Sequence, residues 1–311
     1  MNLMGPQATP RTALVTGATG GIGKVTALEL AKAGYRVLLT SRDAAKGQKV
    51  LAEIRAQSGN DALELFVGDL SSMTDVRRVA LEICARHPKL DVLVNNAGGL
   101  FTERSTTVDG FETTFALNHL SYFLLTNLLL GALKAAGDAR VLGNTAPSGP
   151  ARIVSVSSAA NRLGKINWDD PHFKTGYSAY AAYNQSKLMN VLFANALARR
   201  LRGTGVTSNS LHPGIVRSGF NFNPGGPIRV VFAISKLMAV SPEQGAQTSV
   251  YLATSPEVEG VTGHYFVNKK QKRANPTAYN EAAQERLWAL SEHLLSSWLD
   301  PVESAPVEAR A

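Results

Sequence analysis

The feature that most constrains this chain is a glycine-rich turn near its N-terminus. Residues 12–16 (TALVT) predict a buried strand, and the periodic segment from residue 22 predicts a helix. Between them stand three glycines in a G-x-x-x-G-x-G spacing: Gly17, Gly21 and Gly23. Glycines allow a pyrophosphate to reach the backbone N–H groups at a helix N-terminus, where partial positive charge lies. The alternative is an ordinary tight turn, but the flanking strand and helix favour dinucleotide binding.

A Walker A phosphate loop is the rival interpretation of this turn. That motif requires a glycine where Ala18 stands and a serine or threonine where Val25 follows Lys24. The rival is therefore excluded.

Short β-rich runs alternate with helical segments along most of the 311 residues. Strands are expected near residues 12–16, 35–41, 63–67, 91–95, 151–156, 206–211 and 262–267. Helices are expected near residues 22–33, 43–57, 73–86, 111–134, 179–201 and 243–253. This alternation predicts one α/β domain over residues 12–275, a Rossmann-like doubly wound parallel sheet of about seven strands with helices on both faces.

Three segments depart from this rhythm. Residues 137–150 are small and turn-rich, and we expect a surface insertion there. Residues 276–299 carry leucines and tryptophans at helical spacing, which predicts an amphipathic C-terminal helical extension. Residues 300–311 are expected to be a frayed tail.

Composition argues against several classes of protein. The single cysteine, Cys84, cannot form an internal disulfide, which indicates a reducing compartment and a cytoplasmic location. The six histidines are scattered, so no metal site is predicted. No run of about 18 apolar residues is present, and no basic segment precedes an apolar one at the N-terminus, so neither a spanning helix nor a secretory signal is expected. The net charge is +8, but the basic residues are dispersed without interleaved aromatic residues, so nucleic-acid binding is not expected.

The end of the second strand bears on which dinucleotide binds. Ser41 and Arg42 stand where dinucleotide folds often place an acidic residue that holds the ribose diol. A guanidinium can pair with a 2′-phosphate, and Lys24 could add a second positive charge, so NADP(H) is favoured over NAD(H). Asp43 is either a helix N-cap or a ribose ligand. Asp69, followed by Leu70, either accepts from the adenine amino group or caps the helix that begins near residues 71–72.

Tyr183 and Lys187 are spaced one helical turn apart within a helical segment, which places them on one face. A tyrosine has a pKa of about 10, so it becomes a base near neutral pH only if positive charge stabilises the phenolate. The fifth expected strand ends at Ser157 and Ser158, and ligands bind at the carboxyl ends of parallel strands. Alone, each pair is more often structural than catalytic.

Together the motifs are specific. Gly17-x-x-x-Gly21-x-Gly23, Asn95-Asn96-Ala97-Gly98, Asn118, Ser158, Tyr183-x-x-x-Lys187 and Pro213-Gly214 stand in the order of one family. Over about residues 12–268 the chain resembles the short-chain dehydrogenase/reductase family. Stretches such as HPGIV and SPEQGAQT resemble its retinol dehydrogenase-like branch, as does the long segment between Ser158 and Tyr183.

The resemblance implies a role for each matching residue. Tyr183 would donate and accept the proton, Lys187 would lower the pKa of Tyr183 and hold the nicotinamide ribose, and Ser158, rather than Ser157, would orient the substrate oxygen. Asn118 would hold a water in a proton relay behind Lys187. Ser218 stands near where many relatives carry a threonine. The implied cofactor-binding residues are Gly17, Thr19, Gly21, Ile22, Gly23, Ser41, Arg42, Asp69, Leu70, Asn96, Ala97, Gly98, Tyr183, Lys187, Pro213, Gly214 and Val216.

The implied reaction is hydride transfer between NADPH and a carbonyl, or the reverse from an alcohol. The family places its substrate lid at about residues 217–241, where an apolar stretch favours a lipophilic aldehyde or ketone and leaves peripheral membrane contact open. Reduction of a C=C bond and a non-catalytic NADP-binding sensor are the alternatives. The resemblance also implies a homodimer or homotetramer.

Overall fold

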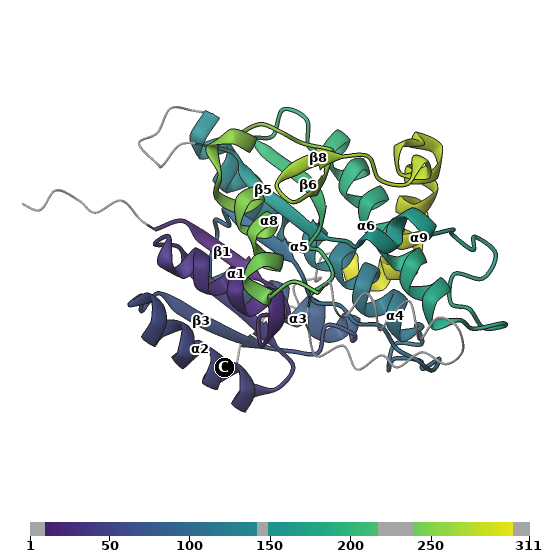
Figure 1. Cartoon of the computed structure of the whole chain (residues 1–311), viewed down its shortest axis with the longest axis horizontal. Coiled ribbons are helices and arrows are strands. Elements are labelled where there is room, and N and C mark those ends of the chain that lie inside the picture. The colour runs from purple at the N-terminus through teal and green to yellow at the C-terminus, as the bar shows by residue number, and fades with distance from the viewer. Residues whose placement is uncertain (1–9, 142–148, 217–238, 301–311) are drawn as a thin grey trace, which may run out of the picture.

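A mostly parallel β-sheet organises the computed structural model, which describes residues 10–141, 149–216 and 239–300 (Figure 1). Its strands run in the order β3-β2-β1-β4-β5-β6-β7-β8. They are β1 Thr12–Val15, β2 Arg36–Ser41, β3 Leu63–Val67, β4 Val92–Asn95, β5 Ala151–Val156, β6 Val206–His212, β7 Tyr265–Val267 and β8 Lys270–Lys272. All pairs are parallel except β7 with β8. The order reverses direction beside β1, which creates the switch point where dinucleotide folds bind ligands.

Helices cover both faces of the sheet. The long helices are α1 Gly21–Lys32, α2 Ala44–Ser58, α3 Met73–Arg86, α5 Ser121–Val141, α6 Ala179–Arg200, α8 Pro242–Thr254 and α9 Glu281–Leu299. Short turns of helix are α4 Thr113–Phe115, the π-helical η1 Ala116–Leu120, and the 3₁₀ turns η2 Ala159–Leu163, η3 Pro256–Val258 and η4 Pro276–Tyr279. Helices α1, α2 and α8 cover one face, and α3, α5 and α6 cover the other, with α9 packed outside them.

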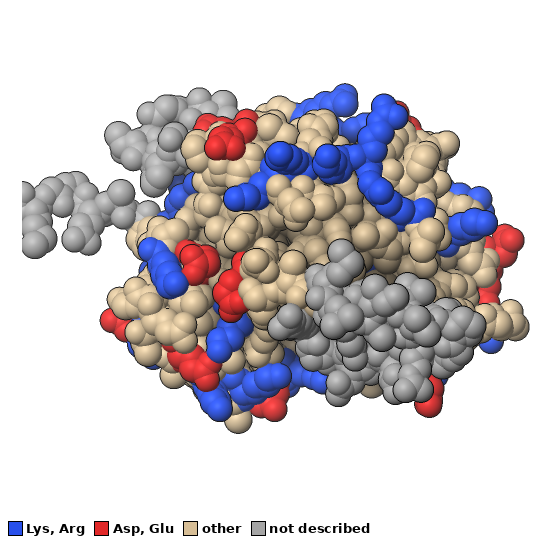
Figure 2. Space-filling model, viewed as in Figure 1, with Lys and Arg blue, Asp and Glu red and all other residues tan. Residues whose placement is uncertain are grey.

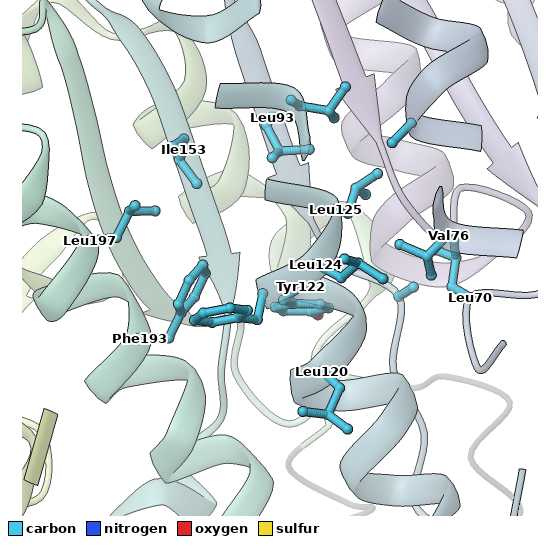
Figure 3. Packing of buried hydrophobic residues seen from close by; sticks show 14 of the residues in the cluster. Leu70, Val76, Leu93, Leu120, Tyr122, Leu124, Leu125, Ile153, Phe193 and Leu197 are labelled. Atoms are coloured by element: carbon cyan, nitrogen blue, oxygen red, sulfur yellow. The ribbon is translucent and has the colours of Figure 1, made fainter. Parts of the chain in front are cut away.

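The core consists of two layers divided by the sheet. Side chains alternate along β1, so that Leu14 packs beneath α3 and α5 while Ala13 and Val15 pack beneath α1 and α8. Figure 3 shows the first layer, where Leu93 and Ile153 of the sheet face side chains of α5 and α6. Burial on both faces explains the continuous apolar runs in these strands.

The structure departs from the predicted elements at two places. An eighth strand, β8, was not predicted, because Lys270–Lys272 are all exposed and carry no apolar alternation; they pair with β7 through a turn in which Asn268 and Lys269 have positive φ. The expected insertion at 137–150 is wrong for its first residues, since α5 continues to Val141. The rest of the expected insertion (142–148), most of the lid expected at about 217–241 and most of the tail expected at 300–311 lie outside the described residues.

The helix predicted at residues 276–299 is α9, preceded by η4. The basic run at Lys269, Lys270, Lys272 and Arg273 is exposed, and Figure 2 shows Lys and Arg side chains gathered over β8.

One helical segment bears on the expectation that the chain has no spanning helix. The helical segment Thr113–Gly137 is long and apolar enough to do so by length and composition, although 67% of its most apolar stretch is buried inside the protein. A helix packed between a sheet and other helices is apolar over most of its circumference, which accounts for its composition.

Candidate active site

The glycine turn between β1 and α1 packs so closely that side chains cannot be accommodated. Gly17 has a φ of +64°, and a Cβ there would lie 2.8 Å from Ala97 Cα. A Cβ on Gly23 would lie 2.4 Å from Gly17 O. Gly21 also has a positive φ, of +52°. The turn therefore keeps the N-terminus of α1 bare, as a pyrophosphate-binding turn requires.

The segment after β4 holds this turn in place. Thr16 Oγ1 accepts from the backbone N–H groups of Asn96 and Ala97 at 2.8 and 3.0 Å. The Asn96 side chain donates to Thr16 O at 2.8 Å and to Gly17 O at 3.3 Å. Asn96 and Ala97 therefore fix the glycine turn to the end of β4.

The polar side chains at the end of β2 have different partners. Ser41 Oγ donates to Asp43 O at 2.7 Å, and the Asp43 carboxylate accepts from Lys46 N at 3.0 Å as the N-cap of α2. Arg42 is exposed and pairs with no acidic side chain among the described residues. Lys24 pairs instead with Glu53 on α2, so its positive charge is largely offset. The guanidinium of Arg42 is therefore available to a phosphate.

Asp69 does not cap the next helix, contrary to one interpretation of the sequence. Ser72 is the N-cap of α3, and Asp69 Oδ1 accepts from the backbone N and the hydroxyl of Ser71 at 2.9 and 2.8 Å. The neighbouring Leu70 is buried in the core. Asp69 orders the turn after β3, and a ligand-binding role for it stays a prediction.

The Tyr183, Lys187 and Ser158 side chains meet at the carboxyl end of β5. Lys187 Nζ lies 5.6 Å from the centre of the Tyr183 ring and donates to Val156 O at 3.2 Å. Tyr183 and Ser158 share a side-chain hydrogen bond. The Ser157 hydroxyl points away and donates to Lys187 O at 2.6 Å, which ties β5 to α6. Of the two serines, Ser158 is thus the one placed beside the tyrosine.

Burial governs the ionisation of this pair. It raises the pKa of the Tyr183 phenol above its usual value, and the hydrogen bond with Ser158 opposes that rise. Burial also lowers the pKa of Lys187 to about 8. In the protein without a cofactor, burial is thus the main influence on the pKa of this phenol, and its acidity in the presence of a bound nicotinamide stays a prediction.

Asn118 sits in η1, where the helical run widens into a π-helical turn. Its side-chain amide donates to Gly99 O at 2.8 Å and to Ser186 Oγ at 2.9 Å, and its Oδ1 accepts from Gly99 N at 2.8 Å. Both amide N–H groups are thus engaged. The structure shows this side chain as a brace between the loop after β4 and α6; its role in a water relay stays a prediction.

Ser186 was missed at the level of sequence. Its hydroxyl accepts from Asn118 and donates to Tyr183 O at 2.8 Å, which links η1 to the tyrosine's helix. No spacing rule distinguishes such a serine from an ordinary helical residue. Only its place between Tyr183 and Lys187 pointed to the region.

The remaining predicted cofactor residues converge from distant segments. Gly214, after Pro213 and β6, has a φ of +92°. A Cβ on Gly245 of α8 would lie 2.5 Å from Val216 Cγ2 and 3.3 Å from Ile22 Cγ1, so Ile22 and Val216 meet over this glycine. Thr19 is half-buried in the glycine turn. Ser218 lies outside the described residues.

Gly98 completes the arrangement. A Cβ at Gly98 would lie 3.0 Å from Asn118 Oδ1 and 3.4 Å from Lys187 Nζ, so the loop after β4 reaches the reactive side chains themselves. The glycines at the turn and the buried Lys187 together fit a dinucleotide laid along the carboxyl edge of the sheet.

Comparisons with known proteins agree with this geometry. The family described as short chain dehydrogenase matches residues 11–224. Human retinol dehydrogenase 14 is 41% identical over 302 residues, covering 91% of this chain and 85% of that protein. Human polyprenol dehydrogenase is 39% identical over 289 residues, covering 92% of this chain and 85% of that protein.

Solved structures show the same fold. The crystal structure of an uncharacterized protein from Mycobacterium paratuberculosis has a TM-score of 0.72 and 31% identity, covering 93% of this chain and 96% of that chain. A complex of Pseudomonas aeruginosa RhlG with NADP has a TM-score of 0.64 and 29% identity, covering 82% of this chain and 93% of that chain. The chain belongs to the short-chain dehydrogenase/reductase family, is retinol dehydrogenase-like, and is an oxidoreductase of the class that acts on CH–OH or C=O groups.

Proposed function

We propose that this protein interconverts a lipophilic ketone or aldehyde and its alcohol, with NADP(H) as the favoured cofactor. The observation that carries the proposal is the meeting of Tyr183, Ser158 and Lys187 beside the glycine turn. When bound, the cofactor supplies or accepts the hydride. All other steps belong to side chains of this chain.

Ser158 and Tyr183 would hold the substrate oxygen with two hydrogen bonds aimed at the negative charge that develops there during reduction. Tyr183 would then give its proton to that oxygen, or take it from the alcohol in the opposite direction. Burial alone raises the pKa of Tyr183, so the phenol favours its protonated form. That protonation state suits carbonyl reduction. Alcohol oxidation requires added positive charge near the phenol.

The cofactor preference rests on Arg42, which is exposed and lacks an acidic partner among the residues described. Asp43, the competing ribose ligand, caps α2. The substrate class is supported by relatives named for retinol and polyprenol. It is also supported by the apolar segment that the sequence places at 217–241, most of which is outside the described residues.

The test is an absorbance assay of reduced nicotinamide, with both cofactors and a panel of aliphatic, aromatic and terpenoid carbonyls and alcohols. Tyr183→Phe should abolish turnover while retaining cofactor binding, since it removes only the proton carrier. Arg42→Ala should weaken NADPH binding roughly 10- to 100-fold, in line with loss of a charge-assisted hydrogen bond, and leave NADH binding unchanged. Equal loss for both cofactors would contradict the assigned role of Arg42.

Product analysis separates the alternatives. Formation of an alcohol from a saturated carbonyl supports the proposal, whereas turnover restricted to conjugated C=C bonds would identify a C=C reductase. Tight NADPH binding without turnover of any panel member, together with a Tyr183→Phe protein that keeps full cellular function, would identify a sensor.

A further inference from the structure

The C-terminal helix α9 reaches the residues assigned to catalysis through one buried hydrogen bond. His119 Nε2 lies 3.0 Å from Ser291 Oγ of α9. Both residues are completely buried. Ser291 Oγ also donates to Leu287 O one turn earlier, at 2.9 Å. His119 directly follows Asn118, so the contact joins α9 to the turn that presents Asn118.

That turn depends on its surroundings for its shape. In η1 the N–H of Ser121 donates to Ala116 O, the wide spacing of a π-helical turn. Such turns are rare, and they occur at functional sites. Asn118 holds one side of η1 through Gly99 and Ser186. His119 holds the other side through Ser291.

The ring of His119 is fixed by apolar contacts as well. It stacks on Phe115 with ring centres 5.8 Å apart and meets Phe193 of α6 edge-on at 6.2 Å. Burial lowers the pKa of His119 to about 3, so the ring stays neutral in the physiological range. The contact with Ser291 therefore positions the turn; it does not switch with pH.

His119 also lies beside the residues behind the catalytic lysine. Its side chain interacts with that of Asn190. Asn190 Nδ2 donates to Val156 O at 3.4 Å, and the same carbonyl accepts from Lys187 Nζ at 3.2 Å. Lys187 and Asn190 thus share one acceptor at the end of β5, and His119 lies next to Asn190 on the side of α9.

The placement of α9 is itself well determined. Trp288 packs against Phe123 of α5 and Phe193 of α6, with ring centres 4.8 and 6.0 Å apart. The guanidinium of Arg200 lies 3.9 Å from the centre of the Trp288 ring, and Glu285 pairs with Arg200. These contacts fix the position of α9, and therefore the position of Ser291 beside η1.

We propose that α9 is a positioning element of the active site, and that Ser291 and His119 are positioning residues that hold Asn118 in place. The kinetic consequence rests on the proposed function. The structural consequence does not, because it concerns only the contact between Asn118 and the loop after β4.

The first test measures hydrogen exchange in the protein without ligand. The Gly99 N–H donates to Asn118 Oδ1, so its protection reports directly on the position of Asn118. Ser291→Ala leaves His119 Nε2 without a buried partner, and we expect the Gly99 amide to exchange roughly tenfold faster through local opening. Asn118→Ala gives the reference for complete loss of this contact.

Two control variants on α9 separate positioning from general destabilisation. Leu295→Ala removes a fully buried side chain and lowers Tm, and Ser296→Ala changes an exposed hydroxyl. Neither should change Gly99 protection after correction for global stability. If Ser291→Ala does not fold, His119→Leu removes the same hydrogen bond and keeps an apolar group among the aromatic rings. Unchanged Gly99 protection in the folded variant would overturn the proposal.

The second test uses turnover with a substrate found by the cofactor assay. Ser291→Ala should lower kcat about tenfold with KM unchanged, because misplacement of a catalytic group affects the chemical step. In the Asn118→Ala background the same change should have no further effect on kcat. Additive losses would overturn the proposal. If the wild-type protein reduces no carbonyl, the proposed function fails, while the exchange experiment still decides the role of α9.

Discussion

Replacing Lys187 with methionine is expected to stabilise the fold while abolishing catalysis. Lys187 is 4% exposed, and burial lowers its pKa from 10.5 to about 8. At about 1.4 kcal/mol per pKa unit, holding this ammonium in the folded protein costs about 3 kcal/mol at pH 7. Methionine has a similar length and no charge. The change also removes the hydrogen bond to Val156 O, worth about 1 kcal/mol, so the net gain is about 2 kcal/mol.

The difference in stability between the wild type and Lys187→Met should depend on pH. Because the folded state has the lower pKa, the unfolded chain binds more protons between pH 8 and 10.5, and this lysine makes the wild type more stable as pH rises through that window. The advantage of Lys187→Met should therefore be full below about pH 8 and shrink by pH 10.

Denaturant unfolding of both proteins between pH 7 and 10 measures this difference, and thermal melting at pH 7 should show a Tm a few degrees higher for Lys187→Met. Lys165→Met, at an exposed position, is the matched control and should show no pH-dependent difference. A Lys187→Met protein less stable than the wild type at pH 7, or a difference constant with pH, would refute the reasoning.

Three further changes test other parts of the structure. Gly23→Ala places a Cβ 2.4 Å from Gly17 O, so both Tm and cofactor affinity should fall. Unchanged NADPH affinity in calorimetric titration would contradict the role of the glycine turn in cofactor binding. Thr16→Val leaves the buried N–H of Ala97 and the partly buried N–H of Asn96 without their acceptor and should cost about 3 kcal/mol in urea unfolding, whereas a loss below 1 kcal/mol would show that they find other partners. Trp288→Ala should cost about 3–5 kcal/mol by the same measurement, and no loss would mean that α9 contributes little to stability.

Where the sequence predictions failed, the missing information was not local. β8 carries Lys270 and Lys272, which look like solvent-exposed loop residues, and only the pairing with Tyr265–Val267 makes the segment a strand. Helix α5 continues past residue 136 to Val141, although Gly137 is a poor helix former.

In the candidate site, too, local features were predictable from the sequence and contacts between distant segments were not. Tyr183 and Lys187 share a helix face by spacing alone, so their association was predictable. Which serine faces the tyrosine was not predictable from spacing, since Ser157 and Ser158 are adjacent and point to opposite sides of an extended strand end. The ion pair between Lys24 of α1 and Glu53 of α2 joins two helices, and no sequence pattern predicts it.

The order of amino acids by itself determined the α/β alternation, the bare glycine turn and the one-turn spacing of the reactive pair, because each depends on residues close together in the chain. Only the tertiary structure decided the direction in which the ionisation of Tyr183 and Lys187 shifts, and the attachment of η1 to α9 through His119 and Ser291. Desolvation and hydrogen bonding between distant segments depend on what surrounds a side chain in space, and spacing along the chain carries no record of those surroundings.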